Sequence, residues 1–178
     1  MKKKSYYISA LCVCAALSAL EIVLNRFGSI NTMGLKIGFA FVPPTFAAIL
    51  FGPVWGAAVY AVSDLLGAIL FPIGPYHPGF TVCAALMGVC AGLFLYNKSG
   101  SVRFFTNILP CVLINCIVFG LFINTAWVSM LYDSRTYWGW FIYRLGEYAI
   151  LIPVELLIIP LLSGVASKVL RQTGSGKE

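Results

Sequence analysis

The sequence predicts an all-α membrane protein in which six transmembrane helices form one bundle over residues 1–178. Of the 178 residues, 60% are apolar and 10% are charged, whereas an average soluble domain carries roughly a quarter charged residues. The mean hydropathy is +0.91. So little polar surface cannot cover a soluble globule, which excludes the soluble classes of protein and predicts an integral membrane domain.

Six apolar segments are separated by polar or Pro/Gly-rich stretches. A helix needs about 20 apolar residues to cross a bilayer, and fewer when it is packed inside a bundle. The second segment is short and contains Pro43 and Pro44, which predicts a kinked or partial span. The expected spans are about 6–27, 37–50, 54–71, 80–96, 104–131 and 139–170. The three longest connections, 28–36, 72–79 and 132–138, are predicted to be loops.

Positive charge predicts the orientation, because cytoplasmic ends of membrane helices carry an excess of Lys and Arg. With the amino terminus inside, the inner ends hold Lys2, Lys3, Lys4, Lys98, Arg103, Lys168, Arg171 and Lys177. Both termini are therefore expected in the cytoplasm, and the three longer loops on the outer face. The cations lie between apolar segments rather than in a soluble domain, which argues against a nucleic-acid partner.

Charged residues inside the spans need a role, because each costs roughly 2.5–3.5 kcal/mol on insertion scales. Arg144, Tyr148 and Glu155 are spaced i, i+4, i+11, which places them on one helical face. Glu147 lies one turn from Arg144 and can pair with it. Arg26 is expected at the same depth as Arg144. The two arginines could accept an anion beneath the outer loops, or they could be internal pairs that hold the bundle together.

The remaining buried acids are interpreted as mainly structural. Glu21 and Glu155 are expected to stabilise the bundle. Asp64 lies in the apolar part of residues 51–80, between a Phe-Gly-Pro turn and a Pro/Gly-rich loop. It could accept hydrogen bonds from a ligand or neutralise an arginine, and we favour the second role.

Aromatic residues are frequent near the predicted outer loops, and most are explained by an interfacial aromatic belt. Tyr76, Trp138 and Tyr143 flank loops that would close over a site, where they could stack on a flat aromatic ligand. His77, the only histidine, could hydrogen-bond a ligand or hold its loop in place. One histidine without a second ligand at a usable spacing predicts no zinc site.

No catalytic motif is present, so the chain is not expected to be an enzyme or to hydrolyse ATP. It lacks GxxxxGK[ST], HExxH and GxSxG. The six cysteines all fall in apolar segments without a CxxC pair, which favours small packing residues over a metal or redox site. Neither a metal nor a cofactor is expected. Small residues at Ala15-x-x-x-Ala19, Gly52-x-x-x-Gly56 and Gly88-x-x-x-Gly92 allow helices to approach closely.

Three stretches carry a resemblance to a known family: AALSALEIVLNRF at 15–27, LKIGFAF at 35–41 and FGPVWGAAVYAVSDLLGAILFPIGPYHPGFT at 51–81. The chain resembles the substrate-binding (S) component of an energy-coupling factor (ECF) vitamin transporter, in its folate-specific branch. The resemblance implies a bacterial plasma-membrane protein that captures folate tightly under its outer loops. It also implies docking on a membrane coupling subunit (T component) driven by two ATPase subunits.

The resemblance also implies roles for single residues. Ala15 and Ala19 match a docking surface for the coupling subunit, and Arg26 matches a position expected to serve the ligand. Folate joins a flat pteridine to an aminobenzoyl ring and a dianionic glutamate, so it needs apolar walls for its rings and cations for its tail. The expected ligand-binding residues are Arg26, Lys36, Tyr76, His77, Trp138, Tyr143 and Arg144.

Two alternative functions stay open. The chain could be an S component for another aromatic vitamin, or a stand-alone ion-coupled carrier. The absence of a convincing internal repeat in the sequence counts against the carrier, since such carriers are commonly built from repeats.

Overall fold

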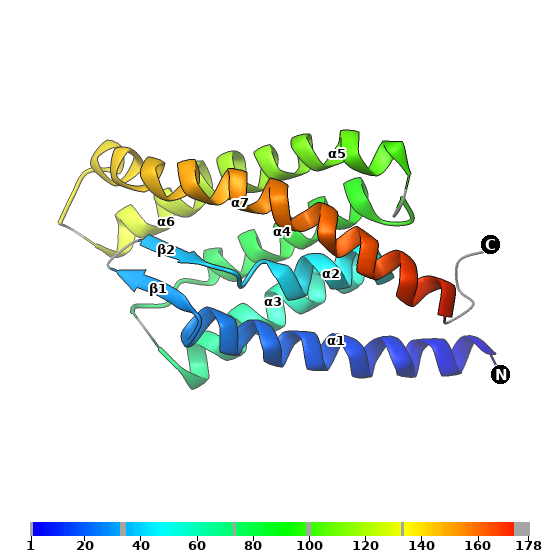
Figure 1. Cartoon of the computed structure of the whole chain (residues 1–178). Helices are drawn as coiled ribbons and strands as arrows, with labels where there is room; N and C mark the ends of the chain where they lie inside the picture. The colour runs from blue at the N-terminus through cyan, green and yellow to red at the C-terminus, as the bar shows by residue number, and fades with distance from the viewer. Residues whose placement is uncertain (1, 33–34, 73, 99–100, 133, 173–178) are drawn as a thin grey trace.

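The computed structural model describes residues 2–32, 35–72, 74–98, 101–132 and 134–172. The helices are α1 (Lys2–Arg26), α2 (Val42–Phe51), α3 (Pro53–Leu70), α4 (Pro78–Leu95), α5 (Val102–Leu113), the π-helix η1 (Ile114–Ile123), α6 (Asn124–Leu131) and α7 (Tyr137–Gln172). Two short strands, β1 (Ser29–Thr32) and β2 (Leu35–Gly38), form an antiparallel hairpin between α1 and α2 (Figure 1).

Five helices of the described chain are long and apolar enough to cross a membrane. They are Tyr7–Arg26, Pro53–Leu70, Pro78–Leu95, Val102–Leu131 and Tyr137–Val169. The fourth combines α5, η1 and α6, which follow one another without a break. Each of the five long spans predicted from the sequence therefore corresponds to one of these helices, with ends shifted by a few residues.

The predicted second span differs most from the structure. Residues 37–50 begin in β2, and only the ten-residue helix α2 follows. The predicted loop at 28–36 is mostly the hairpin, in which Ile30 pairs with Ile37 and Asn31 with Lys36. Four-residue strands are too short to show an alternating pattern, although their β-branched residues favour extended backbone. The predicted all-α class describes the bundle, and the short hairpin is an addition that the sequence did not predict.

α2 lies inside the bundle, which explains how so short an apolar helix is accommodated. Ala47, Ala48 and Ile49 are completely buried, and α2 contacts α1, α3, α4 and α7. Irregular backbone is tolerated at membrane depth when protein surrounds it. The predicted Phe-Gly-Pro turn joins α2 to α3: Gly52 has a φ of +94°, which favours glycine, and Pro53 begins α3.

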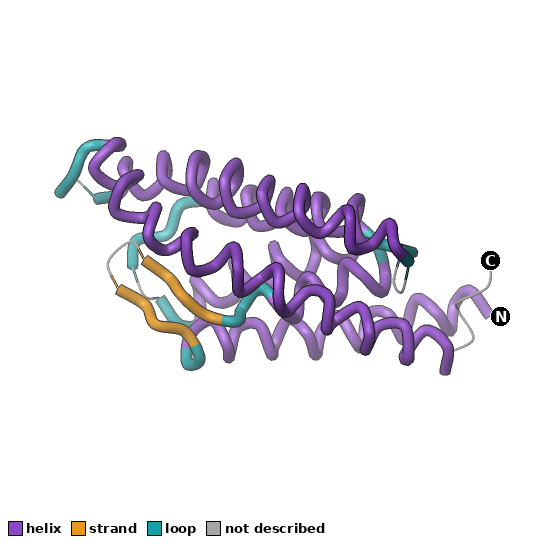
Figure 2. Tube along the Cα trace, turned by 45° about the horizontal axis from the view of Figure 1, so that its top comes forward, coloured by secondary structure: helices purple, strands orange, loops and turns teal. Residues whose placement is uncertain are grey.

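The longer connections gather at one end of the bundle. The hairpin, the connection from α3 to α4 and the connection from α6 to α7 lie at the same end (Figures 1 and 2). The first turn of α1 and the last turn of α7 lie at the opposite end. This common end, called the loop end below, is where the sequence predicted the three longer loops to meet.

Glycines let α3 and α4 pack against each other with their backbones in contact. A Cβ atom on Gly88 would lie 2.5 Å from the carbonyl carbon and oxygen of Gly56, and one on Gly56 would lie 2.9 Å from the Gly88 oxygen. A Cβ atom on Gly92 would overlap Pro53. This contact holds Pro53, and with it the turn from α2 to α3, against α4. The glycine spacings at Gly52-x-x-x-Gly56 and Gly88-x-x-x-Gly92 therefore serve packing within the chain.

We expect Gly88→Ala to destabilise the protein by about 1–3 kcal/mol, because overpacking forces backbone shifts. Gly164→Ala is the matched control, since nothing lies within 4 Å of a Cβ atom at this position on α7. It should be neutral or stabilising by about 0.5–1 kcal/mol, because alanine favours the helix over glycine. Unfolding of the purified variants in detergent measures both changes. Equal effects of the two substitutions would contradict the close α3–α4 contact.

Candidate functional site

A cavity of about 230 Å³ lies inside the bundle on the side of the hairpin, between α1, α3, α4, η1 and α7. Its lining combines polar side chains with an apolar and aromatic wall. The lining residues are Glu21, Asn25, Ser29, Gly38, Ala40, Phe41, Tyr60, Asp64, Phe80, Ala84, Met87, Asn115, Cys116, Asn124, Tyr148, Leu151 and Glu155.

The polar lining combines carboxylates, which accept hydrogen bonds, with carboxamides and hydroxyls, which both donate and accept. Carboxylates come from α1, α3 and α7, and carboxamides from α1, η1 and α6. No lysine or arginine is among the described lining residues. Neutral or donor-rich groups therefore fit this cavity better than an anion, because a carboxylate would be repelled by the acids.

On α1, one turn of helix supplies two polar residues to the wall. Asn25 Nδ2 donates a hydrogen bond to Glu21 Oε1 at 2.6 Å, and both side chains are buried. Ser29, the first residue of β1, donates through its hydroxyl to the Asn25 carbonyl oxygen. The hydrogen bond ties the start of the hairpin to the end of α1, so Ser29 reaches the cavity as well.

Asp64 on α3 connects the cavity to the loop end through a chain of hydrogen bonds. Thr81 on α4 donates its hydroxyl proton to Asp64 Oδ2 at 2.7 Å. Tyr76 lies 2.6 Å from the same Thr81 oxygen, and Tyr76 is the donor because the Thr81 proton is already used. No salt bridge joins Asp64 to an arginine among the described side chains, but the Asp64 charge interacts favourably with Arg26 at longer range, in line with the charge-neutralising role favoured for it from sequence.

Arg144 on α7 does not line the cavity, but it is hydrogen-bonded to the lining residue Tyr148. Its guanidinium donates to Glu147 Oε2 at 3.3 Å, to Thr125 Oγ1 at 3.3 Å and to the Tyr148 hydroxyl at 3.0 Å. Arg144 and Glu147 are 6% and 4% exposed, so the pairing predicted from their spacing is confirmed as a buried ion pair. Tyr148 packs against Gly120, where a Cβ atom would lie 2.6 Å from the ring. The phenol is thus held on both sides.

Three of the expected ligand residues lie close to the cavity without lining it. Arg26 follows the lining residue Asn25 and places its guanidinium against Gly67 of α3. Tyr76 reaches Asp64 through Thr81, and Arg144 holds Tyr148. These residues form a second layer around the polar wall.

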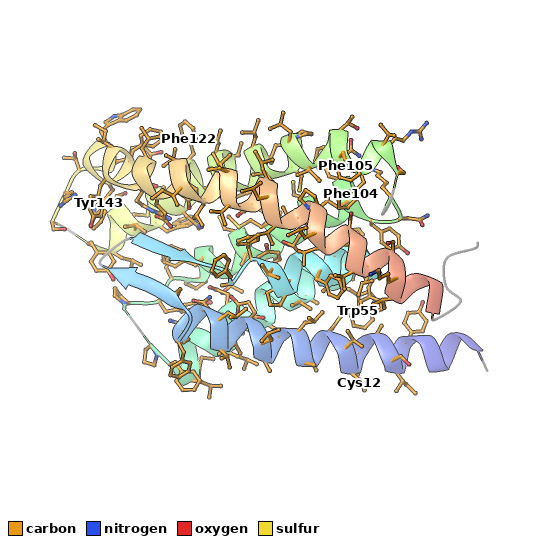
Figure 3. All side chains as sticks on the ribbon, viewed as in Figure 1. Cys12, Trp55, Phe104, Phe105, Phe122 and Tyr143 are labelled. Carbon is orange, nitrogen blue, oxygen red and sulfur yellow. The ribbon has the colours of Figure 1, made fainter. Side chains whose placement is uncertain are left out.

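The other expected ligand residues lie at the loop end. His77 accepts a hydrogen bond from the Gly79 amide at the start of α4 and stacks on Trp127, with ring centres 4.7 Å apart. Trp138 is 65% exposed. Tyr143 also lies at this end (Figure 3), and the guanidinium carbon of Arg135 lies 4.3 Å from the centre of the Tyr143 ring. The backbone of Lys36 is in β2, but its side chain lies outside those that the structure describes.

Ala15 and Ala19 lie on the exposed surface of α1. They are separated by one helical turn, so together they form a shallow strip on that helix. Cys12, one turn earlier on the same helix, also faces away from the bundle (Figure 3). This face of α1 is free to contact lipid or another protein.

The family model described as "ECF-type riboflavin transporter, S component" matches residues 5–167, which is most of the chain. The chain belongs to this S-component family. The S component is a multi-pass protein of the bacterial plasma membrane, and a transporter subunit rather than an enzyme, as its sequence resemblance implied.

Curated relatives of this S component carry the name folate transporter FolT. The protein from Clostridium novyi is 37% identical over 152 residues, which cover 85% of this chain and 86% of the relative. The protein from Leuconostoc mesenteroides is 27% identical over 148 residues, covering 80% and 77%. A crystal structure of FolT bound with folic acid matches with a TM-score of 0.78 at 29% identity, covering 86% of this chain and 92% of that one.

We expect Arg144→Met to lower the free energy of unfolding by about 3–5 kcal/mol, because it removes the cation beside a buried carboxylate. Changing Glu147 as well, in Arg144→Met/Glu147→Gln, should restore at least half of that loss. Arg103→Met, at an exposed position of α5, is the matched control and should change stability by less than about 0.5 kcal/mol. Denaturant unfolding in detergent gives all three values. No recovery in the double variant would contradict the ion-pair role.

Proposed function

We propose that this S component captures folate at the outer membrane face, as the substrate-binding subunit of an ATP-driven ECF vitamin importer. The observation that carries the proposal is the likeness of the fold to FolT bound with folic acid, over most of both chains. The cavity supports it, since it lies between helices and combines an apolar wall with a few polar groups, as small-molecule sites do.

The size and charge of the cavity favour one end of folate. At about 230 Å³, the cavity is smaller than the roughly 300–1,000 Å³ that encloses a drug-sized ligand. We therefore propose that it holds the pteridine ring. The dianionic glutamate would be repelled by Glu21, Asp64 and Glu155, so it extends toward the loop end.

The residues expected from the sequence to bind the ligand are proposed to surround the glutamate of folate. Arg26, between the cavity and the loop end, is proposed to pair with a ligand carboxylate, and Lys36 on the hairpin is proposed to do the same. Arg144 serves the site by holding Tyr148 in its wall. The aromatic residues proposed to cover the bound ligand are Tyr76 and His77, between α3 and α4, and Trp138 and Tyr143, near the start of α7.

The topology and the coupling partners follow from the same proposal. α2 is counted as a sixth, partial span, and both termini lie in the cytoplasm, so the loop end faces outward. Ala15 and Ala19 are proposed to contact the T component, because they are small, exposed and one turn apart on α1. The T component and two ATPase subunits would then supply the energy for import.

Riboflavin is the second candidate ligand. The description of the matching family model names it, and its flat ring system would also suit the apolar wall. Folate is preferred because three curated relatives carry that function in their names.

We expect the purified protein to bind folic acid one to one in calorimetric titration, and to prefer it to riboflavin. Arg26→Ala should weaken folic acid about 10- to 100-fold, as expected for a charge-assisted hydrogen bond. Lys98→Ala is the matched control, since Lys98 donates to carbonyl oxygens at the far end of α4. Its affinity should equal that of the wild type. Preferential binding of riboflavin, or no binding of either vitamin, would contradict the folate assignment.

Uptake of folic acid into liposomes tests the proposed coupling to the T component and the ATPase subunits. The chain alone should bind folic acid without accumulating it, whereas the complete transporter with ATP should accumulate it. Ala15→Trp should abolish that uptake and leave binding intact, because the bulky ring would block close helix approach. Uptake by the chain alone would instead support a stand-alone carrier.

A further inference from the structure

Two asparagines on the helix that spans Val102–Leu131 line the cavity and have buried carboxamide oxygens. Asn115 Oδ1 and Asn124 Oδ1 have no hydrogen-bond partner among the described residues, and both residues line the cavity. Asn115 donates through Nδ2 to the Met87 carbonyl oxygen at 3.4 Å, which orients its amide group. A buried acceptor without a partner costs free energy, so a donor within the cavity would be bound favourably by these two oxygens.

The π-helix η1 is what brings the two asparagines to one face. Nine positions separate them, and in an α-helix of 3.6 residues per turn nine positions correspond to two and a half turns, which places them on opposite faces. A π-helix closes i→i+5 hydrogen bonds and has about 4.4 residues per turn, so nine positions correspond to about two full turns. η1 covers Ile114–Ile123, the stretch between them. Long π-helices are rare, and π-helical turns recur at functional sites.

We propose that Asn115 and Asn124 determine ligand specificity by accepting hydrogen bonds from N–H groups of the heterocycle in the cavity. The inference rests on the proposed folate function and deepens it. Asp64 and Glu155 add acceptors to the same wall, and no described lysine or arginine lines it. The ring that fits is therefore uncharged, rich in N–H groups and without a carboxylate of its own. The pteridine of folic acid presents an amino group and an adjacent ring N–H, which meet this requirement.

A cycle of paired changes in protein and ligand tests the proposal. The protein variants are Asn115→Leu and Asn124→Leu, which keep a similar side-chain shape and remove the acceptor. The ligands are folic acid and two analogues, one without the 2-amino group and one with C–H in place of the ring N3–H. Affinity is measured by calorimetric titration for each combination, and the coupling between the two changes isolates the contact.

Each variant is expected to weaken folic acid about 5- to 15-fold, as expected when one hydrogen bond is lost. For each variant, the loss should shrink below about twofold with at least one analogue, because the donor is already absent. Asn107→Leu is the matched control: Asn107 donates to the Phe94 carbonyl oxygen and does not line the cavity. Its affinity for all three ligands should match the wild type.

Unchanged affinity in both leucine variants would overturn the inference, and so would an equal loss for folic acid and both analogues. In either case, wild-type binding of folic acid would leave the proposed function standing. A wild-type protein that binds no folic acid would overturn both. Thermal unfolding verifies that each variant is folded, and Asn115→Ala and Asn124→Ala enter the same cycle should a leucine variant not fold.

Discussion

The structure depends on one constraint: inside a bilayer, polar groups must find partners within the protein, because no water is present to supply them. Arg144 meets this constraint by donating to Glu147, Thr125 and Tyr148 at once. Asp64 meets it through Thr81, and Glu21 through Asn25. The described lining of the cavity contains three acids and no lysine or arginine, so its wall is rich in acceptors. The chemistry of the site follows from how the bundle satisfies its own buried groups.

Much of this arrangement was predictable from the sequence, because long apolar segments and helical spacing are local signals. The long apolar helices and the Phe-Gly-Pro turn with Gly52 were predicted and are confirmed, and the Arg144–Glu147 pair, which the spacing allowed, is formed. The hairpin was not, since each strand has four residues. The hydrogen bond from Thr81 to Asp64 was not predicted either, because no local pattern links the two residues.

The shared position of Asn115 and Asn124 could not be predicted from the sequence. In an α-helix, Asn115 and Asn124 would lie on opposite faces, so their spacing hides a shared role. Polar residues in an otherwise apolar span were the only available signal. The role of α2 was hidden in the same way, because its burial depends on contacts with α4 and α7, which are distant from it in sequence. Both features depend on three-dimensional context rather than on local composition.

The central claim is that the cavity between α1, α3, η1 and α7 receives the heterocycle of the vitamin. An experimental structure of the protein bound to folic acid tests it most directly. We expect the pteridine in the cavity, between the carboxamides of Asn115 and Asn124 and the wall formed by Phe41 and Phe80, with the glutamate toward the loop end. A pteridine bound elsewhere, or a glutamate inside the acidic cavity, would contradict the account.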